Sequence, residues 1–235
     1  MPRRRRIFTD GACYHITHRC HGRKFLFRFQ KYRDFYVRQL FEMKKRYKVA
    51  VLDYMVTGNH VHLLVTSGKG GEISEGLRFI HGRIGQWHNG QRRREGAFWA
   101  GRFHSTRIQN GEHLGRCLFY IDLNMVRAGA VRHPREWKHC AYSEFMGTRK
   151  RCRIVDFKKL LKCLKCDNAG IFREWYVETL GEKLKARKGE SDNFWSKSVA
   201  VGDPDWLGKK AGECGLKRFR IVASGQSHYL VGKYP

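Results

Sequence analysis

The segment from residue 49 to residue 66 constrains the fold more than any other part of the chain. Two apolar runs, VAVLDYMVT (49–57) and HVHLLVT (60–66), flank a short break at Thr57-Gly58-Asn59. Runs of this length and composition on either side of a glycine-containing turn are typical of paired strands. The segment therefore predicts two strands joined by a tight turn.

The order of the surrounding elements predicts the fold class. Residues 12–19 alternate as a strand does, and a further strand lies within 98–109. Apolar residues recur at helical spacing over 31–48, 73–89 and 112–129. The resulting order, β-α-β-β-α-β followed by one more helix, predicts an α+β fold with a ferredoxin-like antiparallel sheet covered by helices.

The pattern weakens past about residue 150. Residues 156–187 predict a basic helical region, and 203–218 predict one more short helix. The last stretch, RIVASGQSHYLVGKY, is compatible with a strand or with a tail. We therefore expect a first domain at 1–150 and a basic, mostly helical C-terminal extension at 151–235.

The charge balance indicates a polyanionic partner. The chain has 48 Lys and Arg against 21 Asp and Glu, a formal net charge of +27. Such a field attracts polyanions, so nucleic acid is the first candidate and an anionic membrane surface the second. No apolar run is long enough to span a bilayer, and the opening MPRRRRIFTD lacks the apolar core of a signal peptide. These features favour an intracellular protein without a membrane segment.

The eight cysteines are expected to be reduced thiols in an intracellular chain of this size. Cys163 and Cys166 have the spacing of a metal-binding pair, but no second such pair follows them. Two incidental cysteines on a helix are therefore the favoured interpretation. A structural zinc that also uses Cys152 or Cys214 is the alternative.

His60 and His62 form the first candidate site. Alternate residues of a strand share a face, so both imidazoles project the same way while Val61 and Leu63 pack on the other side. Two histidines in this arrangement can form half of a metal site. Taken alone, however, the pair is more often simply two histidines on a wet sheet face.

Tyr120 and Asn124 add the second half of the candidate site. They stand four residues apart in the predicted third helix, so one turn places them on the same face. The amide of Asn124 offers a neutral oxygen ligand, and the hydroxyl of Tyr120 can attack phosphorus once it loses its proton. The alternative for Tyr120 is a tyrosine that only packs in the core.

These residues lie in segments that together resemble a known family. The segments GNHVHLLV, FWAGRFHS and YIDLNMVRAGAV, followed by a tryptophan and a serine at Trp137 and Ser143, resemble the HUH single-tyrosine transposases, specifically the REP-associated tyrosine transposases. The resemblance covers roughly residues 2–147. Gly58 and Met125 stand where that family usually has proline, and neither change removes a chemical group from the site.

The resemblance implies the HUH nuclease fold, a catalytic domain at 1–150 and a role for each candidate residue. It implies that His60, His62 and Asn124 bind Mg²⁺ or Mn²⁺ and that Tyr120 is the nucleophile. The implied reaction cleaves and rejoins single-stranded DNA, folded as hairpins or palindromic repeats, through a 5′-phosphotyrosine. By resemblance the protein is bacterial, cytoplasmic and associated with the nucleoid, and relatives exist both as monomers and as homodimers. Basic residues that could contact DNA phosphates are Arg3, Arg4, Arg5, Arg6 and Arg102, and the lysine-rich extension adds further candidates.

Two other functions fit some of the same features. A non-catalytic nucleic-acid-binding protein with an RNA-recognition-like sheet would also be basic and rich in aromatics. It would not need His60, His62, Tyr120 and Asn124 together. A replication initiator or relaxase of the wider HUH group would use the same chemistry, but 235 residues leave little room for its usual helicase or primase module.

Overall fold

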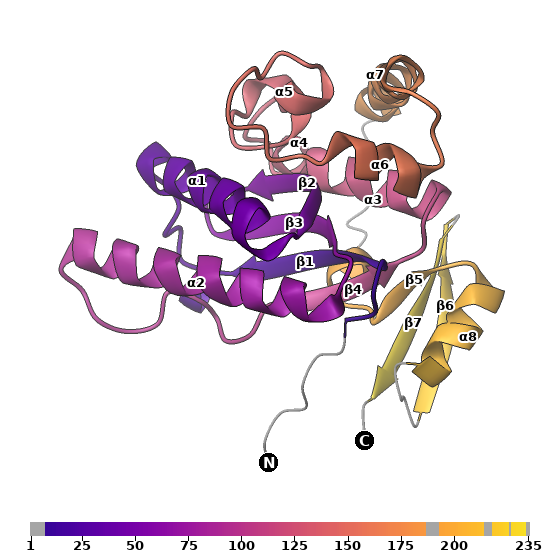
Figure 1. The fold of residues 1–235 in the computed structure, drawn as a ribbon, viewed down its shortest axis with the longest axis horizontal. Helices are drawn as coiled ribbons and strands as arrows, with labels where there is room; N and C mark the ends of the chain where they lie inside the picture. The colour runs from indigo at the N-terminus through magenta and orange to yellow at the C-terminus, as the bar shows by residue number, and fades with distance from the viewer. Residues whose placement is uncertain (1–7, 187–192, 214–217, 226, 234–235) are drawn as a thin grey trace.

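The computed structural model describes residues 8–186, 193–213, 218–225 and 227–233. Its first part follows the order β1 (Cys13–Arg19), η1 (His21–Arg23), α1 (Gln30–Tyr47), β2 (Ala50–Val56), β3 (His60–Thr66), α2 (Gly70–Arg92), β4 (His104–Ile108) and α3 (Glu112–Asp122). The predicted β-α-β-β-α-β order and the helix after it are confirmed (Figure 1).

The first four strands form the ferredoxin-like part of the sheet. Their order is β2-β3-β1-β4, and each neighbouring pair is antiparallel. Every second side chain of β1 and β3 therefore faces the same layer. His18 of β1 contacts His81 of α2, whereas His15 on the opposite face of β1 lies beside Tyr120 of α3. Helices α1 and α2 thus cover one face of the sheet, and α3 covers the other (Figure 1).

The turn between β2 and β3 fixes where His60 begins its strand. The backbone N–H of Thr57 donates to the carbonyl of His60 at 3.0 Å, which closes the predicted hairpin. At Gly58, a Cβ atom would lie only 2.8 Å from the ring of Phe25. Glycine therefore lets the Phe25 ring pack directly against the turn.

The third helix is divided, in contrast to the continuous helix predicted over 112–129. Helix α3 ends at Asp122, and a short helix α4 (Asn124–Arg127) follows. The residue between them, Leu123, has a ψ of 1° in place of the helical value. The N–H of Leu123 still donates to Phe119, and that of Arg127 donates to Leu123, so the turns stay in register across the break. Tyr120 and Asn124 are consequently still about one turn apart.

The C-terminal extension begins with helices and ends with strands. Two short elements, η2 (Pro134–Glu136) and α5 (Tyr142–Phe145), precede it. The extension itself contains α6 (Phe157–Leu164), α7 (Ala169–Ala186), η3 (Asn193–Ser196), β5 (Ala200–Gly202), α8 (Pro204–Glu213), β6 (Arg218–Ser224) and β7 (Ser227–Lys233). The three last strands continue the sheet in the order β5-β7-β6, and β5 pairs in parallel with β4. One sheet therefore runs across the predicted boundary at residue 150, and the domain division stays a prediction.

Helix α7 packs on the outer side of α3. The Phe119 ring stacks on the Tyr176 ring at 5.2 Å, and the Tyr176 hydroxyl donates to the buried carboxylate of Asp122 at 2.6 Å. A buried carboxylate is costly unless it is hydrogen-bonded, so this contact fixes α7 against the end of α3. The extension thereby supports the helix that carries Tyr120.

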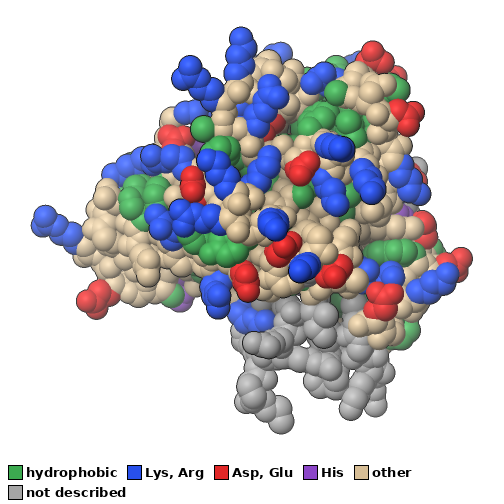
Figure 2. Space-filling view, in the orientation of Figure 1, with side chains coloured by type: hydrophobic (Ala, Val, Ile, Leu, Met, Phe, Trp, Pro, Cys, Tyr) green, Lys and Arg blue, Asp and Glu red, His purple; other side chains and the backbone are tan. Residues whose placement is uncertain are grey.

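In the described part of the chain, no helix combines the length and the apolar character that crossing a bilayer requires. Basic side chains are scattered over the face seen in Figure 2, with acidic side chains interspersed among them.

Candidate active site

His60 and His62 project from the same face of β3, as the alternation predicted. Their ring centroids are 4.7 Å apart. His62 is 2% exposed and lies opposite Thr17 of β1 in the sheet register, whereas His60, at the first position of the strand, is only partly buried. The pair therefore presents one imidazole deep in the structure and one nearer the surface.

The hydrogen bonds of His60 determine which of its ring nitrogens is free. Its Nδ1 lies 2.7 Å from the Asn59 side-chain oxygen and 2.9 Å from the Thr57 hydroxyl. That hydroxyl gives its own proton to the His60 carbonyl, so toward the ring it can only accept. Nδ1 must then carry the proton, and Nε2 of His60 keeps its lone pair.

A chain of hydrogen bonds gives His62 the same tautomer as His60, with the proton on Nδ1. The Nδ1 of His15 lies 2.8 Å from the backbone carbonyl of Trp195, which can only accept, so this nitrogen donates. In a neutral ring the Nε2 of His15 then accepts, and its partner at 2.9 Å is the Nδ1 of His62. Nδ1 of His62 is therefore the donor, and its Nε2 also keeps a lone pair.

Burial keeps all three imidazoles neutral. It lowers the pKa of His15 to about 4 and that of His60 to about 4, and it lowers the pKa of His62 well below its usual value. The neighbouring histidines and Arg19 lower the pKa of His62 further by charge repulsion. Near neutral pH the rings are thus in the unprotonated form that a metal ion requires.

Asn124 completes a group of three ligand-forming side chains. Its amide nitrogen lies 3.2 Å from Nε2 of His62. Rotation of the amide group by half a turn about the Cβ–Cγ bond would place the amide oxygen there instead. Two neutral imidazoles and one amide oxygen fit a divalent ion and would leave further positions for phosphate oxygens and water. In the described residues, no group of three or more His, Cys, Asp and Glu side chains is arranged to hold a metal.

Tyr120 lies directly beside this group. Its ring centroid is 5.8 Å from that of His62 and 5.8 Å from that of His15. The Tyr120 hydroxyl lies 3.0 Å from the hydroxyl of Ser196. Burial raises the pKa of Tyr120, while the hydrogen bond with Ser196 and the charge of Arg127 act in the opposite direction. The phenol is therefore protonated at neutral pH and must lose its proton to act as a nucleophile.

Arg127 lies over the tyrosine. Its guanidinium carbon is 4.6 Å from the centre of the Tyr120 ring, and its Nη2 donates to the Tyr120 carbonyl at 2.6 Å. A guanidinium this close places positive charge beside the phenol, and a guanidinium is a group that can bind phosphate oxygens.

The residues predicted to contact DNA are only partly described. Arg3, Arg4, Arg5 and Arg6 lie outside the described residues. Arg102 is exposed in the loop before β4, and its contact with DNA stays a prediction.

Cys163 and Cys166 have different surroundings. Cys163 is buried against Cys13, whereas the Cys166 thiol donates to the Asn168 carbonyl at 3.5 Å. The two thiols therefore interact with different neighbours in the structure.

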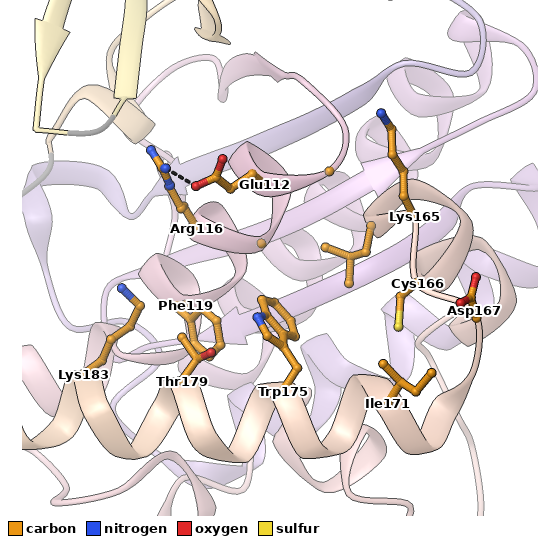
Figure 3. Close-up of a pocket in the computed structure, with 13 residues that line it drawn as sticks. Glu112, Arg116, Phe119, Lys165, Cys166, Asp167, Ile171, Trp175, Thr179 and Lys183 are labelled. Carbon is orange, nitrogen blue, oxygen red and sulfur yellow. Dashed lines mark hydrogen bonds and ion pairs between the residues drawn. The ribbon is translucent and has the colours of Figure 1, made fainter.

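A cavity of about 510 Å³ lies between α3 and α7 (Figure 3). Its lining includes Phe119, Trp175 and Lys183, and none of the predicted site residues. Phe119 faces this cavity, while its neighbour Tyr120 faces the histidines. The cavity and the histidine–tyrosine cluster are therefore separate features on different sides of α3.

The sequence analysis did not identify four residues of the histidine–tyrosine cluster: His15, Arg127, Trp195 and Ser196. Arg127 follows Tyr120 by seven residues, two helical turns, and this spacing could have indicated it. The position of His15 depends on the register between β1 and β3. Trp195 and Ser196 come from the extension, and no local pattern marks them.

Comparison with known proteins gives a family match for the first half of the chain. A family model described as "Transposase IS200 like" matches residues 9–124, a segment that contains His60, His62, Tyr120 and Asn124. No curated protein matches the chain.

The solved structures that resemble the chain include two transposases. One is a REP-associated tyrosine transposase bound to a REP hairpin, with 18% identity and a TM-score of 0.54 over 68% of this chain and 96% of the other. This similarity shows a shared fold. The other is a candidate transposase from Deinococcus radiodurans R1, with 14% identity and a TM-score of 0.37 over 49% of this chain and 91% of the other.

The matched segment runs from before β1 to the first residue of α4 and so spans the ferredoxin-like sheet and the helix that carries the tyrosine. IS200-like transposases are enzymes that act on single-stranded DNA and generally depend on a metal ion. Residues 9–124 of the chain thus match the IS200-like transposase family.

Proposed function

We propose that this protein cleaves and rejoins single-stranded DNA with Tyr120 as the nucleophile and with a metal ion held by His60, His62 and Asn124. The observation that supports this assignment best is the hydrogen-bonding of the two histidines. Partners on Nδ1 leave both Nε2 atoms unprotonated, and the Asn124 amide and the Tyr120 ring lie next to the ring of His62. A non-catalytic binding protein would have no use for this combination.

The chemistry follows from the positions of these groups. The Tyr120 oxygen attacks the phosphorus of a DNA phosphodiester, and a tyrosine–phosphorus bond forms as the bond to the 3′-oxygen breaks. The tyrosine proton is lost during the attack, and the departing 3′-oxygen takes up a proton to become a hydroxyl. A bound Mg²⁺ or Mn²⁺ would supply Lewis-acid stabilisation of the charge on the phosphate oxygens. Because one phosphodiester replaces another, the reverse step can rejoin the strand without ATP.

The substrate we propose is single-stranded DNA folded into hairpins or palindromic repeats. The similar solved structure holds a hairpin, and the net charge of +27 favours a polyanion. The protein would act on it as a monomer or a homodimer.

The direct test is a search for the covalent intermediate. Labelled single-stranded hairpins incubated with the protein and Mg²⁺ or Mn²⁺ are expected to give a protein–DNA adduct that survives denaturation. Hairpins should also compete better than blunt duplex of equal length. Hairpin binding without any adduct would instead favour the non-catalytic nucleic-acid-binding function, and equal competition by duplex would contradict the proposed substrate.

Asn124→Ala is expected to weaken metal binding without eliminating cleavage. The variant removes a neutral oxygen, a weaker ligand than an imidazole, and keeps both histidines. Activity should fall at limiting metal and recover in part as Mn²⁺ is raised, which a metal titration of the cleavage rate would measure. Wild-type behaviour at limiting metal would show that Asn124 only packs beside His62.

A further inference from the structure

The short helix η3 carries two residues of the C-terminal extension into the candidate active site. Trp195 is 2% exposed, and its carbonyl accepts the hydrogen bond from His15 that begins the chain to His62. The next residue, Ser196, places its hydroxyl 3.0 Å from that of Tyr120. Two adjacent residues of this segment therefore contact the histidines and the tyrosine of the site. Ser196 lies 76 positions after Tyr120 in the sequence.

This segment is fixed in place by contacts that do not involve Tyr120. The Ser198 carbonyl accepts hydrogen bonds from the side chains of His104 and Thr106 in β4, each at 2.9 Å. The Ser198 hydroxyl donates to the Phe194 carbonyl at 2.6 Å and closes the turn around Ser196. Because β4 and this turn hold the segment, the Ser196 hydroxyl is a fixed partner for the tyrosine.

Within the described residues, the Ser196 contact is the hydrogen bond that orients the Tyr120 hydroxyl. The phenol is otherwise held through its ring, with His62 and His15 at 5.8 Å and Trp195 at 6.2 Å between centroids. The Arg127 guanidinium lies 4.6 Å from the ring centre. Ring packing restricts the plane of a phenol, but it does not fix the direction of the O–H bond. Attack on phosphorus requires the oxygen and its lone pair in a defined position, and misplacement slows the reaction even when binding is unchanged.

We infer that Ser196 is a further residue of the active site, which holds the phenolic oxygen of Tyr120 in the position from which it attacks. This role rests on the proposed function, since it requires Tyr120 to be the nucleophile. It gives the extension a catalytic contribution: its residues 195 and 196 complete the site that the family segment at 9–124 begins.

Full-length Ser196→Ala, Ser196→Thr, Ser198→Ala and Tyr120→Phe proteins provide the test. The measurement is the single-turnover rate of adduct formation at saturating single-stranded hairpin DNA with Mn²⁺, together with the Kd for the same hairpin. Loss of one hydrogen bond predicts a rate about 3- to 10-fold lower for Ser196→Ala, with an unchanged Kd. Ser196→Thr keeps the hydroxyl and should retain a rate within about twofold of wild type, by the same reasoning.

Ser198→Ala tests the contribution of the turn itself, because it removes the hydroxyl that closes the turn around Ser196 and does not touch Tyr120. Its rate should remain above that of Ser196→Ala. A wild-type rate for Ser196→Ala, or a rate for Ser196→Thr as low as that of Ser196→Ala, would overturn the role of Ser196 and leave the proposed function intact. Adduct formation by Tyr120→Phe would overturn the proposed function, and the role of Ser196 with it.

Discussion

Tyr120→Phe is expected to abolish the covalent protein–DNA adduct while the affinity for hairpin DNA stays nearly unchanged. The substitution removes only the hydroxyl, and the ring can keep its contacts with His15, His62 and the Arg127 guanidinium. Because no other group replaces the nucleophile, the rate of adduct formation should fall by at least about 1,000-fold. Denaturing gels with labelled hairpin DNA measure the adduct, and a binding titration measures the affinity.

The matched control for this prediction is Tyr142→Phe. Tyr142 is partly buried, its ring packs against those of His133 and Tyr176, and burial raises the pKa of its phenol as it does for Tyr120. The Phe variant at this position should form the adduct at a rate close to wild type. If Tyr120→Phe still couples to DNA and Tyr142→Phe does not, the nucleophile has been assigned to the wrong tyrosine.

His60→Ala and His62→Ala are each expected to eliminate nearly all cleavage, by about 100-fold or more. Each substitution removes a neutral imidazole whose Nε2 is unprotonated. The nearby imidazole of His15 has both ring nitrogens in hydrogen bonds, with Trp195 and with His62, so we do not expect it to take the place of either ligand. Unlike Asn124→Ala, neither variant should recover substantially at high Mn²⁺. The comparison requires cleavage rates across a metal titration and direct calorimetric measurement of metal binding.

His133→Ala is the control for loss of an imidazole. His133 is partly exposed and packs against Tyr142, so its removal should leave cleavage and metal affinity close to wild type. Wild-type metal affinity in both His60→Ala and His62→Ala would place the metal elsewhere, and full cleavage in either would remove that residue from the site.

The local pattern of the sequence was sufficient for the first half of the fold. Strand alternation and helical spacing depend on neighbours a few positions away, so the hairpin at 49–66 and the order of elements around it could be predicted. The same alternation placed His60 and His62 on one face, and the four-residue spacing placed Tyr120 near Asn124 despite the break at Leu123. The resemblance of these motifs to the tyrosine transposases then indicated the family.

What the sequence could not provide are contacts that depend on distant parts of the chain. Pairing of β1 with β3 sets His15 against His62, and strand register is decided by the packing of the whole sheet. The pairing of β5 with β4 brings the extension to the same sheet, and the segment before β5 brings Ser196 to Tyr120. A serine has no periodic signature, so its role becomes visible only when tertiary packing has placed it beside the phenol. The sequence thus determined which groups can do the chemistry, and the tertiary structure decided their tautomers, their burial and the partners that hold them, because each of these depends on long-range contacts.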